Sequence, residues 1–74
     1  MNTPKYEQVA SAIRDQIHAG KLRPGDQLPT TKGLIETYGV SYGSVRTALL
    51  ILKAEGLIEG RQGEGVYVRD PGAQ

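Results

Sequence analysis

The apolar residues in the first third of the chain recur at steps of three and four. They are Tyr6, Val9, Ala10, Ile13 and Ile17. Only a helix keeps such a series on one face. Thr3 offers a capping hydroxyl, Pro4 has the φ of a first helical turn, and Gly20 can take the left-handed conformation that ends a helix. The pattern predicts a helix over about residues 4–19.

A shorter stretch with the same period follows a loop. Leu34, Ile35 and Tyr38 predict a helix over about residues 31–38, with Thr30 as its cap and Gly39 as its end.

The most strongly patterned segment comes next. Its apolar stripe consists of Val45, Ala48, Leu49 and Leu52. Ser41 can cap this helix and Gly56 can close it, so we expect a helix over roughly residues 42–55.

From Leu57 onward the period changes from helix to strand. Residues 57–59 and 66–68 are two short segments with β-branched or aromatic residues around a glycine-rich turn, which predicts a β-hairpin. Earlier in the chain, Pro24-Gly25 predicts a type II turn in a loop that Leu22 and Leu28 anchor.

Only Gly39-Val40-Ser41 separates the helices predicted at 31–38 and 42–55. Such a short link forces two helices to cross steeply, as in a helix-turn-helix. With the hairpin, the expected fold is mainly α: a winged helix-turn-helix of three helices plus a two- to three-stranded antiparallel wing. We assign residues 1–69 to this domain and residues 70–74 to a flexible tail or the start of a linker.

Length and composition exclude several classes of function. Seventy-four residues make one domain, too small for a two-domain enzyme. The longest apolar run, 48–52, is far below the roughly 20 residues that span a bilayer, so we expect a cytoplasmic protein without a membrane partner. There is no cysteine, and the single His18 cannot build a histidine metal site. We therefore expect no enzyme, no metal and no cofactor.

The placement of charged residues is more informative about a binding partner than the net charge of +1. Residues 41–53 contain Arg46 and Lys53 and no acidic residue. The start of the second helix of a helix-turn-helix enters the major groove of DNA, which makes its first residues candidate DNA contacts. They are Ser41, Tyr42, Gly43, Ser44 and Arg46. Arg46 is the strongest candidate because its guanidinium can fork onto guanine or a phosphate.

Two alternatives remain open for these side chains. Arg46 could instead pair with Glu36 on the preceding helix, and Tyr42 could pack beneath the turn. In the hairpin, Arg61, Gln62 and Gly63 could approach a groove, whereas Glu64 opposes an anionic partner. A plain hairpin whose glycines serve turn geometry alone is the other interpretation.

Five segments together resemble the DNA-binding domain of GntR-type bacterial transcription regulators. They are Leu28-Pro29-Thr30, Gly39-Val40-Ser41, Val45-Arg46-Thr47-Ala48-Leu49, Glu55-Gly56-Leu57-Ile58 and Arg61-Gln62-Gly63-Glu64-Gly65-Val66. The resemblance covers about residues 4–69. It implies an operator-binding winged helix-turn-helix that usually acts as a dimer on a palindrome. The family adds an effector-binding domain, which we do not find within these 74 residues.

The chain departs from the family pattern at several positions. Thr31 and Lys32 stand where the family usually has an acidic and then a basic residue, and Lys32 can keep a phosphate or base contact. Tyr42 replaces a common arginine, and Gly43 replaces a bulkier polar residue. The apolar pair Leu50-Ile51 stands where polar residues are usual, which leaves two alternatives: burial by the hairpin or the first helix, or a patch for a second subunit.

The resulting hypothesis is a sequence-specific transcription regulator that binds double-stranded DNA. We expect a repressor rather than an activator, and a chain that can form a homodimer at least on DNA. The alternative is a winged-helix protein-interaction module, which the near-neutral charge and Leu50-Ile51 favour.

Overall fold

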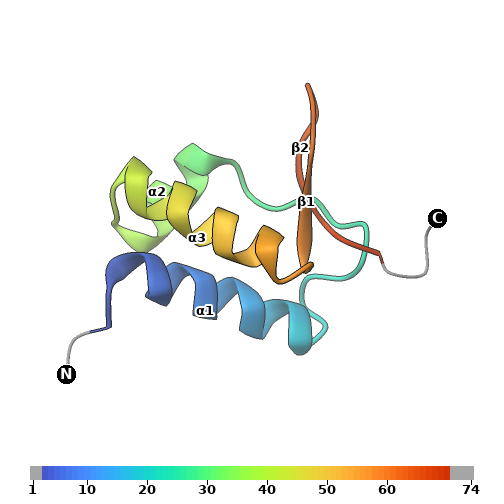
Figure 1. The fold of residues 1–74 in the computed structure, drawn as a ribbon, viewed down its shortest axis with the longest axis horizontal. Coiled ribbons are helices and arrows are strands. Elements are labelled where there is room, and N and C mark those ends of the chain that lie inside the picture. Colours follow the sequence, from blue (N-terminus) through green and yellow to red (C-terminus); the bar gives the residue numbers. More distant parts are fainter. Residues whose placement is uncertain (1–2, 71–74) are drawn as a thin grey trace.

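Helix α1 spans Lys5–His18, α2 spans Thr31–Tyr38 and α3 spans Tyr42–Ala54. The computed structural model describes residues 3–70. After α3 the chain forms one antiparallel hairpin, with β1 at Ile58–Arg61 and β2 at Gly65–Val68 (Figure 1). The three predicted helices are therefore confirmed to within one residue at each end. The predicted strands are confirmed too, although the hairpin ladder runs closer to its turn than expected. Most of the tail predicted for 70–74 lies outside the described residues.

Capping explains where two of the helices begin. The Thr30 hydroxyl accepts from the backbone N–H of Gly33 at 3.0 Å, and the Ser41 hydroxyl accepts from that of Ser44 at 3.1 Å. Gly39 ends α2 with a φ of +64°, a conformation that a residue with a Cβ adopts only at a cost. Both predicted hydroxyl caps are thus confirmed, and together they limit the link between α2 and α3 to three residues.

The predicted Thr3 cap is wrong. Pro4 itself occupies the cap position of α1, and no side chain caps this helix. The Pro4 carbonyl accepts from the N–H groups of Glu7 and Gln8 at 3.0 and 3.1 Å. Thr3 therefore lies one residue too early for its hydroxyl to reach the first turn.

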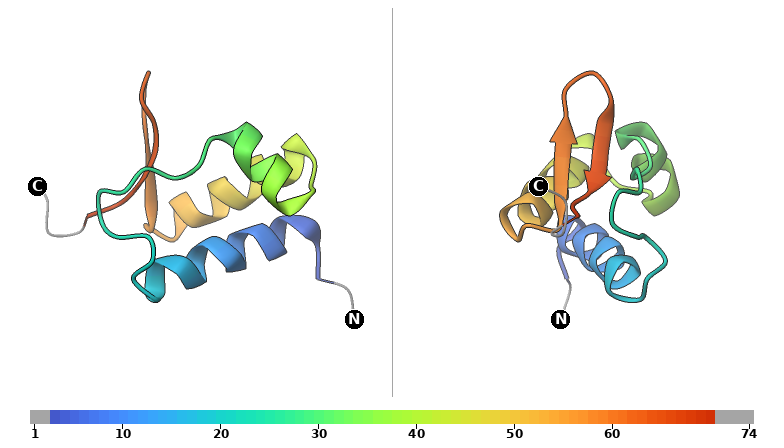
Figure 2. Two further views of the ribbon diagram at one scale, coloured as in Figure 1. Left: turned by 180° about the vertical axis from the view of Figure 1, so that it is seen from behind. Right: turned by 90° about the vertical axis from the view of Figure 1, so that its right-hand side faces the viewer.

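The core lies where α1, α2 and α3 meet the base of the hairpin. Helices α1 and α3 run side by side, and α2 lies beside the start of α3 (Figures 1 and 2). The buried apolar residues are Val9, Ala10, Ile13, Leu28, Leu34, Val45, Ala48, Leu49, Leu52, Ile58 and Val68. Each predicted helical stripe contributes to this cluster, which is why the spacing in the sequence anticipated the packing.

The wing projects beyond the helices (Figure 2) and is braced by the loop that precedes α2. The N–H of Leu28 donates to the carbonyl of Val66, and the N–H of Val68 donates to the carbonyl of Asp26, both at 2.8 Å. A single bridge, Gln27 to Tyr67, is all that forms of a third strand in the described residues. The predicted turn at Pro24-Gly25 is confirmed, with a φ of +89° at Gly25.

An ion pair fastens α1 to the end of α3. Arg14 Nε and Nη2 donate to the two carboxylate oxygens of Glu55 at 3.0 and 2.9 Å. The hydrogen bond to Glu55 raises the pKa of Arg14 above its usual value. Because α3 carries the candidate interface, this two-bond contact helps to fix its orientation on α1.

Candidate nucleic-acid interface

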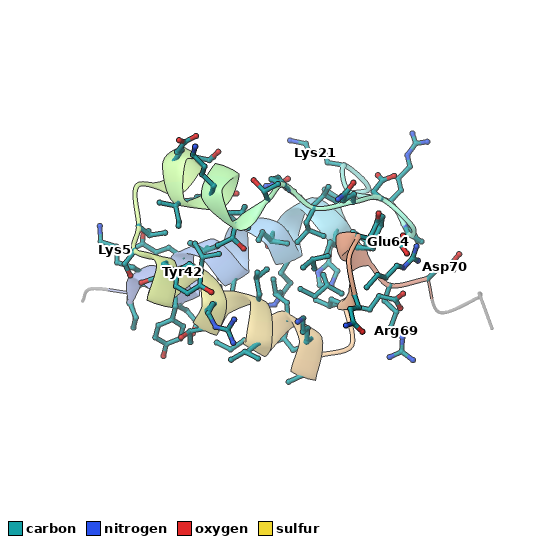
Figure 3. The ribbon with its side chains drawn as sticks, turned by 90° about the horizontal axis from the view of Figure 1, so that it is seen from above. Lys5, Lys21, Tyr42, Glu64, Arg69 and Asp70 are labelled. Atoms are coloured by element: carbon teal, nitrogen blue, oxygen red, sulfur yellow. The ribbon has the colours of Figure 1, made fainter. Side chains whose placement is uncertain are left out.

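One side of α3 is buried and the other side faces solvent. The stripe of Val45, Ala48, Leu49 and Leu52 packs into the core. The opposite side presents exposed residues that include Tyr42, Gly43, Arg46, Thr47, Leu50 and Lys53. Figure 3 shows Tyr42 at the start of this helix and Glu64 at the wing. The exposed side of α3 is therefore available to a partner, as a helix that enters a DNA groove must be.

Arg46 lies at the surface beside Tyr42. Its Nη1 donates to the tyrosine hydroxyl at 3.5 Å, a long hydrogen bond, and its Cζ is 6.0 Å from the ring centre. Within residues 3–70 the ion pairs join Arg14 to Glu55 and Arg61 to Glu59, so the alternative pairing of Arg46 with Glu36 is not formed. The guanidinium of Arg46 thus keeps most of its donors for another partner.

Tyr42 does not pack beneath the turn. The residue is 57% exposed, which rules out the alternative of a buried position beneath the turn. Gly43 next to it leaves open space, since an added Cβ would meet only the Ser41 hydroxyl at 3.9 Å. The aromatic ring therefore stands uncovered at the front of α3.

Ser41 and Ser44 are partly occupied by the helix cap. The Ser41 hydroxyl accepts from the Ser44 N–H, and the two hydroxyl oxygens lie 3.1 Å apart. If one hydroxyl donates to the other, one hydroxyl hydrogen of the pair remains for an outside acceptor such as a phosphate oxygen. Their first role is to start α3, and a DNA contact would be additional.

In the wing, Arg61 is tied to its own hairpin. Its Nε donates to the Glu59 carboxylate at 3.1 Å, and its Cζ lies 4.2 Å from the centre of the Tyr67 ring. The strand register places Glu59 opposite Tyr67, so all three side chains share one face. Arg61, a candidate groove contact, is therefore paired within the wing, and the ion pair is half exposed.

The tip of the wing consists of exposed backbone and amide groups. Gln62 and Gly63 form a turn that the Glu64 N–H closes by donating to the Arg61 carbonyl at 3.0 Å. Gly63 has a φ of +77° and nothing within 4 Å of where a Cβ would stand. A narrow tip of this kind can approach a groove closely.

A shallow hollow of about 150 Å³ separates α3 from the wing. It is lined by Thr31, Tyr42, Arg46, Leu49, Leu50, Lys53 and Val66. Lys53 reaches from α3 toward the wing, where a Cβ on Gly60 would lie 3.3 Å from its ammonium nitrogen. Lys53 contributes to the basic character of residues 41–53 but is not among the predicted site residues. Its position in the last turn of the helix was the available signal.

Two further predictions can be compared with the structure. Lys32 is exposed on α2, which agrees with a contact there. Leu50 is 56% exposed whereas Ile51 is half-buried, so burial by neighbouring elements accounts for only one of these two apolar residues.

No helix among residues 3–70 has the length and apolar character to cross a membrane. Nor does this part contain a group of three or more histidine, cysteine, aspartate or glutamate side chains placed to hold a metal ion.

Residues 5–68 match the model of a family described as bacterial regulatory proteins of the gntR family. The chain belongs to the GntR family. The winged fold and the resemblance noted in the sequence are both confirmed by this match, because it spans all three helices and the wing.

Similar proteins include the mannosyl-D-glycerate transport/metabolism system repressor MngR of Escherichia coli, 46% identical over 67 residues. The histidine utilization repressor of Klebsiella aerogenes is 39% identical over 71 residues. These alignments cover 90% and 96% of this chain but only 28% and 30% of the relatives. The chain thus spans less than a third of the length of the curated relatives that it matches.

The DNA-binding domain of AraR in complex with operator ORR3 has the same fold. Its TM-score is 0.88 at 37% identity, over 92% of this chain and 82% of that one. The similar proteins are named as repressors or titled as an operator-bound DNA-binding domain, which agrees with the predicted class of DNA-binding transcription regulator. The individual DNA contacts of Lys32, of the exposed side of α3 and of the wing remain predictions.

Proposed function

We propose that this chain binds operator DNA and represses transcription by occupying it. Helix α3 enters the major groove, and the wing lies along the adjoining groove or backbone. The observation that carries the proposal is the exposed side of α3, where Arg46 forms no ion pair with the described residues. A forked guanidinium at the start of a recognition helix is suited to reading guanine.

Charge supports the same orientation. Arg46 and Lys53 lie on the exposed side of α3, and Lys32 lies on α2. We assign Lys32 and Lys53 to phosphates, which position a protein on the duplex, and Arg46 to a base, which gives sequence preference. The acidic Glu55 at the end of α3 pairs with Arg14 and does not oppose this surface.

The wing contributes backbone and amide groups more than charge. Gln62 and Gly63 form its exposed tip, whereas Arg61 is paired with Glu59. Gln62 and the backbone of the tip therefore make the main contact in the adjoining groove. Arg61 joins only when its ion pair opens.

Pairing and location follow from this assignment. MngR and the histidine utilization repressor are named as repressors, and AraR is titled as bound to an operator. We infer that this chain acts in the bacterial cytoplasm, where operators are accessible, and that two copies bind neighbouring half-sites, so that the symmetry of the site matches that of the protein pair.

Selection of bound sequences from a random duplex pool tests the proposal. We expect one enriched motif, symmetric if two copies bind. Titration of the selected duplex should then show that Arg46→Ala weakens binding by about 1–3 kcal/mol and lowers sequence preference. No enrichment, together with no binding to random duplex at low salt, would leave the protein-interaction module as the better hypothesis.

A further inference from the structure

On the exposed side of α3, a charged side chain lies between two large apolar ones. Tyr42, Arg46 and Leu50 follow one another at four-residue steps, so they lie along one ridge of the helix. Tyr42 and Leu50 are 57% and 56% exposed and are the large apolar side chains that stand out most on the described surface. A guanidinium thus stands between two apolar groups on the helix assigned to the major groove.

We propose that Tyr42 reads the 5-methyl group of a thymine next to the base that Arg46 contacts. This inference rests on the proposed function, since it requires α3 in the major groove. It makes Tyr42 a specificity-determining residue that selects thymine at one operator position by apolar contact rather than by hydrogen bonding.

The chemistry of the groove favours this assignment. Base edges in the major groove present hydrogen-bond donors and acceptors, and the thymine methyl is their one apolar feature. An aromatic ring pressed against a polar edge would leave that edge without its water and without a partner. The same ring against a methyl group removes apolar surface from water on both sides.

The geometry places the ring where such a contact can form. Tyr42 is the first residue of α3, next to the Ser41 cap. The absence of a side chain on Gly43 leaves space beside it. The ring also stands 6.0 Å from the Cζ of Arg46, a distance at which the two groups can reach neighbouring base pairs together. Leu50 lies two turns further along α3 and lines the hollow toward the wing.

Replacing thymine by uracil in the selected duplex tests the proposal, because this change removes only the methyl group. Each thymine of the selected duplex is replaced in turn, and binding is titrated with the unaltered chain. At one position per half-site, next to the base whose preference Arg46→Ala relaxes, affinity should fall about fourfold, the value of one buried methyl group. Replacement at the other positions should change little.

Three variants then assign the methyl effect to a side chain. Tyr42→Ser should abolish the difference between thymine and uracil, whereas Tyr42→Phe should keep it, because the ring and not the hydroxyl makes the contact. Leu50→Ala is the matched control, with the same exposure on the same ridge, and it should keep the difference. All three positions are exposed, so the fold should be preserved, as circular dichroism can verify.

Other results would overturn the proposal. A methyl effect that survives Tyr42→Ser, disappears with Tyr42→Phe or depends on Leu50 assigns the contact elsewhere. A duplex that is selected and bound without any uracil effect contradicts the inference and leaves the proposed function intact. Failure to select any duplex contradicts both.

Discussion

Gln27 and Gly65 approach so closely that a Cβ on Gly65 would lie 2.7 Å from the amide nitrogen of Gln27. The same amide donates to the carbonyl of Glu64 at 3.0 Å. Gly65 also has a φ of +131°, a conformation that side chains rarely adopt. The loop before α2 therefore contacts the wing beside a backbone position that favours glycine, and the two segments lie nearly 40 positions apart in the sequence.

Gly65→Ala should destabilise the domain by about 1–3 kcal/mol, because alanine is strained at this φ. Chemical denaturation measures the change. The double variant with Gln27→Ala should not recover the loss, since the Gln27 amide is the end of a flexible side chain and can move aside cheaply. Gly60→Ala is the control in the same hairpin without positive φ. Equal stability of the Gly65→Ala and Gly60→Ala proteins would argue against backbone strain.

Glu59→Gln should strengthen binding to random duplex, because it releases Arg61 from its ion pair. We expect the dependence of affinity on salt to steepen by about one counterion, as for one new phosphate contact. Titration at several salt concentrations measures this slope.

Glu64→Gln is the matched control for this prediction, because it makes the same charge change at the tip without breaking a described ion pair. In an Arg61→Ala background, Glu59→Gln should change the salt slope no more than Glu64→Gln does. If Glu59→Gln acts equally with and without Arg61, the ion pair does not restrain a DNA contact.

Lys53→Ala should weaken binding to the selected duplex and to random duplex by similar factors. Its ammonium lies between α3 and the wing, where a phosphate can reach it, so the salt slope should fall by about one. Lys21→Ala removes the same charge from the loop after α1 and should leave the slope unchanged. A change of sequence preference with Lys53→Ala would instead indicate a base contact.

Local patterns explain why much of the fold could be predicted. The helical stripes depend on spacing within about 15 residues, and the caps at Thr30 and Ser41 depend on a hydroxyl that lies three residues before the N–H that donates to it. Thr3 shows the limit of this reasoning. It has the right residue type, but Pro4 takes the cap position, and a shift of one residue decides whether a hydroxyl can reach.

The candidate site was less predictable because its restraints join distant segments. Arg61 meets Tyr67 only after the register of the hairpin is set, and Arg14 meets Glu55 across 41 positions. The exposed state of Tyr42 likewise depends on how α2 and α3 cross. Residue type identified Arg46, Tyr42 and Arg61 as candidates, whereas tertiary contacts decided which of them is held by its own chain.

Arg14→Gln should lower the midpoint of thermal unfolding by a similar amount at pH 7 and at pH 9. The two hydrogen bonds to Glu55 are lost, and the glutamine cannot replace the forked guanidinium. The pKa of Arg14 is raised in the folded protein, chiefly by the hydrogen bond to Glu55. A group of this kind stabilises the fold at every pH below its unfolded pKa and loses that contribution only as the pH rises through the folded pKa.

For an arginine both of these pKa values lie above the range of the measurement, so the pair should add no pH dependence between neutral and mildly alkaline solution. The loss should also be smaller than that of Leu52→Ala, which removes a fully buried side chain and costs about 2–5 kcal/mol. Added salt should shrink the difference between the unaltered chain and Arg14→Gln, because the ion pair is partly exposed. A difference that grows from pH 7 to pH 9 would contradict this account and assign the effect to another titrating group.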